Sequence, residues 1–97
     1  MVINVLDHVP HCYTGSDGAV IASVIRQGFV RGEHVTVSFA GVTDVPSSFV
    51  NGAIVSLLED YTFEFIRQNL SVRDSTFQIN DMIRRRVRFV ADQLVAA

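Results

Sequence analysis

The stretch VTVSFAGVTDVPSSFVNG, residues 35–52, contains a strand pattern, a turn and the start of a helix. Apolar and polar side chains alternate over residues 34–39, which is typical of a strand with one buried face. A glycine ends this run, and Pro46 and two serines precede a new apolar series. Because a serine hydroxyl can accept a hydrogen bond from a free amide of a first helical turn, we expect a helix to begin near Ser47 or Ser48, capped by one of them.

The strand period of two residues and the helix period of about 3.6 residues predict the elements in the rest of the chain. Strands are expected at residues 2–6, 34–39 and 70–73. A helix at 47–60 and a short one at 62–69 are expected between the second and third strands. Two further helices are expected: one capped by Ser16, with inward residues Val20, Ile21, Val24 and Ile25, and one opening in a Ser75–Gln78 capping box, with inward residues Ile79, Ile83, Val87, Val90 and Leu94.

This β-α-β-α-β-α order predicts one α/β domain over residues 1–97, with a small mixed or parallel sheet. A strand covered on both faces would be apolar throughout, and the middle strand is not, so we expect the helices mainly on one face. In that register Thr36 and Ser38 point away from the helices. The buried layer is expected to place Val35, Val37 and Phe39 against Val20, Ile21, Val24 and Ile54.

The composition favours a folded cytoplasmic protein. Hydrophobic residues make up 48% of the chain and charged residues 19%, which argues against disorder. No apolar run approaches the roughly 20 residues of a membrane span. The net charge of −2 argues against general attraction to nucleic acid. Cys12 is the one cysteine, so an internal disulfide is excluded and a reducing compartment is the simplest interpretation.

Residues 35–49 resemble the central segment of STAS domains, the fold of the bacterial anti-anti-sigma factors. Gly41 matches the turn glycine of that segment, and Ser47 and Ser48 match its serine pair. Ser38, Pro46 and Phe49 stand where the pattern has aspartate, aspartate and glycine. With these residues the chain resembles more closely the STAS-like proteins of unknown function, which also share the segments Phe63–Phe65 and Met82–Arg85.

The resemblance implies a STAS-like fold and a regulatory module without catalysis or cofactor. Members of that group are often encoded beside histidine-kinase-like ATPases, which implies partner switching with such a protein. Ser47 matches the phosphorylated position of the anti-anti-sigma motif. The expected contact surface covers residues 43–52, and its candidate partner-binding or phosphorylated residues are Asp44, Ser47, Ser48 and Asn51.

Two other classes of function remain open from the sequence. The polar face of the middle strand suits a self-associating scaffold domain, which would be a homodimer. His8, His11 and Cys12 offer three metal ligands within five residues, as a small metal protein or enzyme would need. They lack a fourth ligand and the paired spacing of zinc sites, so we expect no metal there.

The remaining motifs do not suggest catalysis. The sequence has no phosphate loop, no glycine-rich nucleotide fingerprint and no nucleophile elbow, so we expect no enzyme. Four arginines, Arg84, Arg85, Arg86 and Arg88, gather on the last expected helix. Successive helical residues are spread around the axis, so a solvated face is the simpler interpretation than a phosphate-binding patch.

Overall fold

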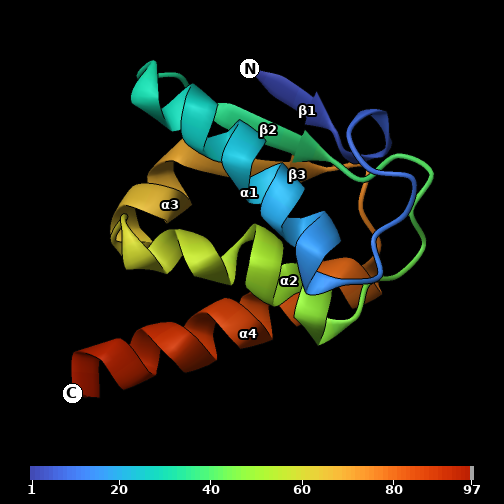
Figure 1. Ribbon diagram of the computed structural model, residues 1–97. Coiled ribbons are helices and arrows are strands. Elements are labelled where there is room, and N and C mark those ends of the chain that lie inside the picture. Colours follow the sequence, from blue (N-terminus) through green and yellow to red (C-terminus); the bar gives the residue numbers. More distant parts are fainter. Residues whose placement is uncertain (97) are drawn as a thin grey trace.

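The computed structural model describes the backbone of residues 1–96 and the side chains of residues 1–93. Its strands and helices alternate along the chain (Figure 1). In order they are β1 (Val2–Asn4), the 3-10 helix η1 (Val5–Asp7), α1 (Gly15–Val30), β2 (Val35–Ser38), α2 (Ser47–Ala53), the 3-10 helix η2 (Val55–Glu59), α3 (Phe63–Asn69), β3 (Leu70–Arg73) and α4 (Phe77–Ala96). None of these helices is both long and apolar enough to span a membrane.

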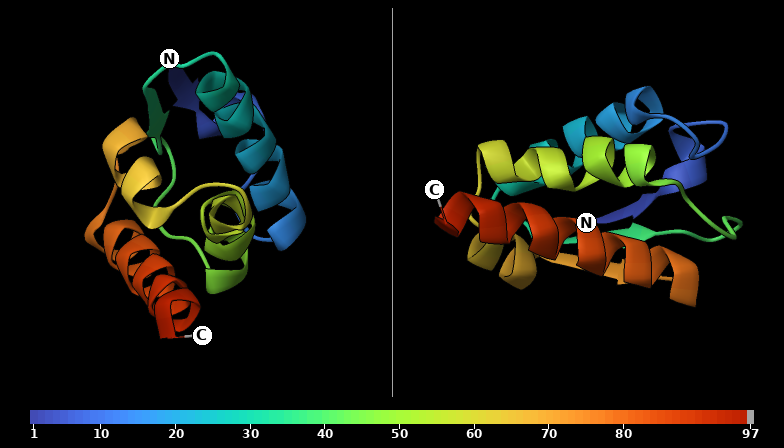
Figure 2. Two further views of the ribbon diagram at one scale, coloured as in Figure 1. Left: turned by 90° about the vertical axis from the view of Figure 1, so that its left-hand side faces the viewer. Right: turned by 90° about the horizontal axis from the view of Figure 1, so that it is seen from below.

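The three strands form one parallel sheet in the order β1-β2-β3. Val37 in the middle strand is level with Ile3 on one side and Val72 on the other. Helices α1, α2 and α4 lie on the same side of this sheet (Figure 2). The α/β class and the one-sided helical layer are therefore confirmed, and the sheet is parallel rather than mixed.

The buried layer agrees with the expected strand register. Val35, Val37 and Phe39 are at most 1% exposed and belong to one core with Ile21 and Ile25 of α1. Val20, expected in this layer, is 43% exposed, because the stripe that α1 turns inward centres on Ile21 and Ile25.

Ser38, on the opposite strand face, is buried as well, at 1% exposure. Its hydroxyl donates to the Asp74 carboxylate at 2.7 Å and accepts from the Ala40 amide at 3.3 Å. These hydrogen bonds satisfy the buried hydroxyl, which would otherwise be costly to remove from water.

The expected cap of α1 was wrong by two residues. Thr14, not Ser16, accepts from the Asp17 amide at 3.1 Å, and the Asp17 carboxylate accepts from the Thr14 amide at 3.3 Å. This reciprocal pair is a capping box, and it selects Thr14 because only that register gives both bonds.

Replacing Thr14 by alanine should lower the free energy of unfolding by about 0.5–2 kcal/mol, because a first-turn amide loses its acceptor. Ser16→Ala, at an exposed site inside the first turn, should change it by less than about 0.5 kcal/mol. Urea denaturation of both variants measures the difference, and equal losses would contradict the capping assignment.

The helix expected at 47–60 is shorter and is not capped by a serine. Pro46 occupies the N-cap position, and no side chain caps the helix. Regular α-helix ends at Ala53, and the chain continues as η2. Gly52 weakens the helix at this point, and the Ser56 hydroxyl donates to its carbonyl oxygen at 2.7 Å.

The last helix also begins differently from the expected Ser75–Gln78 capping box. The Thr76 hydroxyl accepts from the Ile79 amide at 3.2 Å, while the Gln78 side chain is bound elsewhere. Ile79 and Val87 are buried as expected. Ile83 and Val90 are half-buried, and the side chain of Leu94 lies outside the described residues.

Candidate functional site

The carboxyl ends of the three parallel strands lie along one edge of the sheet. The loops that follow β1 and β2, residues 5–14 and 39–46, meet there, on the right-hand side of Figure 1. Ligands of open parallel α/β sheets bind outside this edge, because the loops there can vary while the sheet stays fixed. We call these two loops together with Ser47 and Ser48 the strand-end surface.

The connector that leads to α2 is held by the start of α4. The Gln78 side chain accepts from the Val45 amide and donates to the Val45 carbonyl oxygen, both at 2.9 Å. The Thr76 hydroxyl donates to the Thr43 carbonyl oxygen at 2.9 Å. Val45 is 3% exposed, so its side chain is buried in the core and anchors the connector. The neighbouring residues Thr43, Asp44 and Pro46 are exposed to solvent.

The serine pair is exposed, and its two hydroxyls differ. The Ser48 hydroxyl donates to the Tyr13 carbonyl oxygen at 3.4 Å, a long contact that ties α2 to the first loop. The Ser47 hydroxyl makes no hydrogen bond within residues 1–93. Both serines are exposed, and within the described side chains the Ser47 hydroxyl is the one of the pair that has no hydrogen-bond partner.

The two other candidate residues have different surroundings. Asp44 is exposed, and its carboxylate accepts from the Thr43 hydroxyl at 3.4 Å. Asn51 is half-buried, and its side-chain oxygen accepts from Arg86 Nε at 3.1 Å. Asp44 thus lies with the serines on the strand-end surface, whereas Asn51 joins α2 to α4.

The structure adds two apolar residues that the sequence had not indicated. Tyr13 is 63% exposed and stacks on the His11 ring, with ring centroids 4.6 Å apart. Leu6 is 40% exposed and lines, with Tyr13 and residues 41–44, a hollow of about 150 Å³. The first loop lies beside the connector because β1 pairs with β2 in parallel. The sequence could have indicated this contact, since the loops that follow neighbouring strands of a parallel sheet lie at the same edge.

The three potential metal ligands do not converge. Cys12 is buried at 2% exposure, whereas His8 is exposed. His11 Nδ1 lies 3.3 Å from the Asp17 carboxylate. The pKa of that carboxyl is lowered, chiefly by the hydrogen bond from the Tyr13 amide. Within the described part of the chain, no three His, Cys, Asp or Glu side chains are grouped as metal ligands.

Burial raises the pKa of the Cys12 thiol to about 11, and the nearby Asp17 charge adds to the shift. Because the thiolate is the reactive form, alkylation by iodoacetamide near pH 8 should be about a hundredfold slower than for a free cysteine. The rate should rise up to about pH 11. Protein unfolded in guanidinium chloride is the control, and a folded rate equal to the unfolded one would contradict this.

The arginines of α4 have separate contacts. Arg84 and Arg85 form ion pairs with Asp81 at 3.3 and 2.9 Å, and all three lie on one helix. Arg86 lies over the Phe89 ring, 5.3 Å from its centroid. Most of these groups are thus neutralised or engaged locally, as a solvated helix face would be.

These features define a small α/β domain with a parallel sheet, helices on one face and exposed serines where a strand connector enters a helix. A family model described as a STAS-like domain of unknown function (DUF4325) matches residues 20–79, and the chain belongs to this family. The match extends from α1 through the connector to the first turn of α4. No curated protein and no solved structure matches the chain.

Proposed function

We propose that this chain is a regulatory protein–protein interaction module that acts by partner switching with a histidine-kinase-like ATPase. The contact is the strand-end surface, with Asp44, Ser47 and Ser48 at its centre and Tyr13 beside them. The reaction on which the switch depends is carried out by the partner, and this chain supplies the surface that is recognised.

The observation that carries this proposal is the exposed Ser47 at the start of α2, directly after a connector that hydrogen bonds from Thr76 and Gln78 hold in place. The buried Val45 below it is bound through both backbone polar groups by Gln78. A partner would therefore meet a preformed surface and lose little free energy in ordering it. Membership of the STAS-like family supports the same assignment.

The proposed switch is phosphorylation of Ser47. A phosphate adds about −1.5 to −2 charges and three acceptor oxygens at neutral pH. Asp44 already places one carboxylate on the same surface, so the added charge creates a concentrated negative site. A partner that buries this site without a compensating cation loses affinity, and dephosphorylation restores binding.

Ser47→Asp should weaken binding to the proposed partner, a histidine-kinase-like ATPase, by at least about tenfold, because a charge is placed in the contact. Ser47→Ala should bind like the unaltered protein. Titration calorimetry measures the affinities, and urea denaturation checks that the fold is intact.

Ser23→Asp provides the matched control, since Ser23 is an exposed serine on α1 outside the strand-end surface. It should leave the affinity unchanged. If Ser47→Asp and Ser48→Asp both bound as tightly as the control, the serine switch would be disproved.

The uncovered face of the sheet supports a second candidate, self-association as a scaffold domain. Asn4, Ser71 and Arg73 are exposed on this face, and α1, α2 and α4 all lie on the other. A homodimer formed here would be insensitive to changes at Ser47 and Ser48. Sedimentation velocity of the purified chain distinguishes the candidates, because the first requires no dimer.

A further inference from the structure

Two neighbouring hollows open beside α4, one against the end of η2 and the start of α3 and the other against α3 and β3, at the opposite end of the sheet from the strand-end surface. The larger, of about 560 Å³, lies between residues 58–63 and the last described turns of α4. The smaller, of about 230 Å³, lies between α3, β3 and α4. Phe63 and Arg88 line both hollows, so the two are adjacent, and together we call them the α3–α4 groove.

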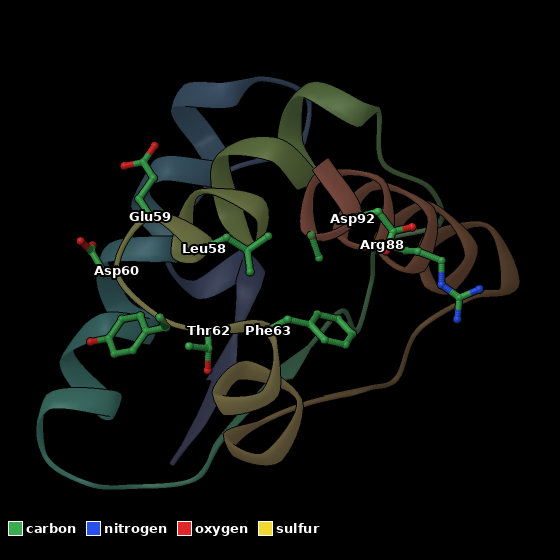
Figure 3. A pocket seen from close by; sticks show the side chains of 9 residues that line it. Leu58, Glu59, Asp60, Thr62, Phe63, Arg88 and Asp92 are labelled. Carbon is green, nitrogen blue, oxygen red and sulfur yellow. The ribbon is translucent and has the colours of Figure 1, made fainter. Parts of the chain in front are cut away.

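The floor of the groove is apolar. The smaller hollow is lined by six aliphatic side chains, Ile54, Ile66, Leu70, Val72, Ile83 and Val87. Figure 3 shows Leu58 and Phe63 in the middle of the larger hollow, with Glu59 and Asp60 to one side of them and Arg88 of α4 to the other. Phe63 is 43% exposed, so part of its ring faces water. An apolar groove of this kind accepts the apolar stripe of an amphipathic helix.

The charges on the rim differ between the two ends of the groove. The described residues around the smaller hollow include three arginines, Arg67, Arg84 and Arg88, and no acid. Those around the larger hollow include three acids, Glu59, Asp60 and Asp92, with Arg88 as the one base. Figure 3 shows Glu59 and Asp60 on one side of the larger hollow and Arg88 on the other. Asp60 is paired with Arg26 at 3.2 Å, which leaves Glu59 and Asp92 as the other acids of the larger hollow. The lining of the groove thus has an excess of arginines at the smaller hollow and of acids at the larger one.

Arg88 is the cation with the most freedom to meet a ligand. Arg67 and Arg84 pair with acids of their own helices, at 2.7 and 3.3 Å. Arg88 forms no ion pair with any side chain of residues 1–93. It lines both hollows, so a carboxylate placed above the smaller one would lie within its reach.

We propose that the α3–α4 groove binds an amphipathic helical segment of a protein partner, with carboxylates at one end of that segment and basic side chains at the other. The apolar stripe fills the two hollows, the carboxylates face Arg88, and the basic end faces Glu59. Charge complementarity along the groove selects this occupant, because a uniformly acidic or basic helix would meet like charge at one end.

This site is separate from the strand-end surface. Leu70 opens β3 and lines the smaller hollow, so the groove lies at the amino ends of the strands. In Figure 1 α3 and the end of α4 are on the left, and the strand-end loops are on the right. One partner can therefore occupy the groove while another contacts Ser47.

The test uses a synthetic helical peptide of about 15 residues, with leucines at i, i+3, i+4 and i+7, arginines at one end and glutamates at the other. Its control is an isomer of the same composition in which the charged residues alternate. Amide shifts in NMR spectra should map the first peptide to residues 54–72 and 83–92. The isomer should bind about tenfold more weakly.

Protein variants test the role of the cation. Arg88→Glu should weaken binding of the first peptide about tenfold, because like charges then meet. Arg85→Glu, on the same helix but outside the groove lining, should leave it unchanged. Equal binding of both peptides, or binding that both variants leave intact, would overturn the proposal. The proposal would also be overturned if the first peptide shifted no amide of the groove. It would be overturned as well if the chain formed a homodimer that Arg88→Glu dissociates, because a second copy would then occupy the groove.

Discussion

Replacing Phe39 by alanine should lower the free energy of unfolding by about 3–5 kcal/mol, the cost of emptying a buried aromatic site. Phe39 is 1% exposed and lies just beyond β2, between the sheet and the helical layer. Its ring meets that of Phe49 edge to face, with centroids 6.4 Å apart. Urea denaturation monitored by circular dichroism measures the change.

Phe77→Ala is the matched control, because it deletes the same atoms at a site that is 82% exposed. It should change the free energy of unfolding by less than about 0.5 kcal/mol. A loss below about 1 kcal/mol for Phe39→Ala would contradict its place in the core. The difference between the two variants isolates burial from any effect of the substitution on the unfolded chain.

The elements that the sequence predicted well are those with strong periodicity. The alternation through Val35, Val37 and Phe39 fixed the buried strand face, since a one-residue slip would expose all three. The short helix at 63–69 and the strand Leu70–Arg73 agree with expectation, and Thr62 caps the former. Local pattern was sufficient there because burial follows the same period as the backbone.

The starts of the helices were predicted less well, because tertiary contacts decide which of several neighbouring hydroxyl residues caps the helix. Ser75 and Gln78 have the spacing of a capping box, yet Gln78 binds the Val45 backbone. Val45 is 33 residues away, and no local pattern contains that contact. Gln78 satisfies two buried backbone groups there, which a cap at its own helix would leave unpaired.

In the candidate site, too, local sequence pattern predicted some features, while others depend on tertiary contacts. That Ser47 and Ser48 are exposed beside α2 follows from the strand, the proline and the apolar series after it. The engagement of Asn51 by Arg86 depends on how α4 crosses α2, which the sequence does not state. Tyr13 joins the surface only because β1 pairs with β2 in parallel.

Replacing Gly18 by alanine should lower the free energy of unfolding by about 1–3 kcal/mol or more, because the added methyl group has no room. A Cβ at Gly18 would lie 2.4 Å from the Phe49 carbonyl oxygen and 2.7 Å from the Ala53 nitrogen. These are backbone atoms of α2, which cannot rotate away as a side chain could. The clash should outweigh the advantage of about 1 kcal/mol that alanine has over glycine inside a helix.

Gly15→Ala is the control on the same helix, since a Cβ there would meet only the Ser48 carbonyl oxygen, at 3.6 Å. It should leave stability unchanged or slightly higher. Gly52→Ala should behave like Gly18→Ala, because its Cβ would lie 2.4 Å from the Gly15 carbonyl oxygen. If urea denaturation showed that Gly18→Ala lowers the free energy of unfolding no more than Gly15→Ala does, α1 and α2 could move apart at little cost. Since α2 carries Ser47, such freedom would also remove the rigid presentation on which the proposed partner contact depends.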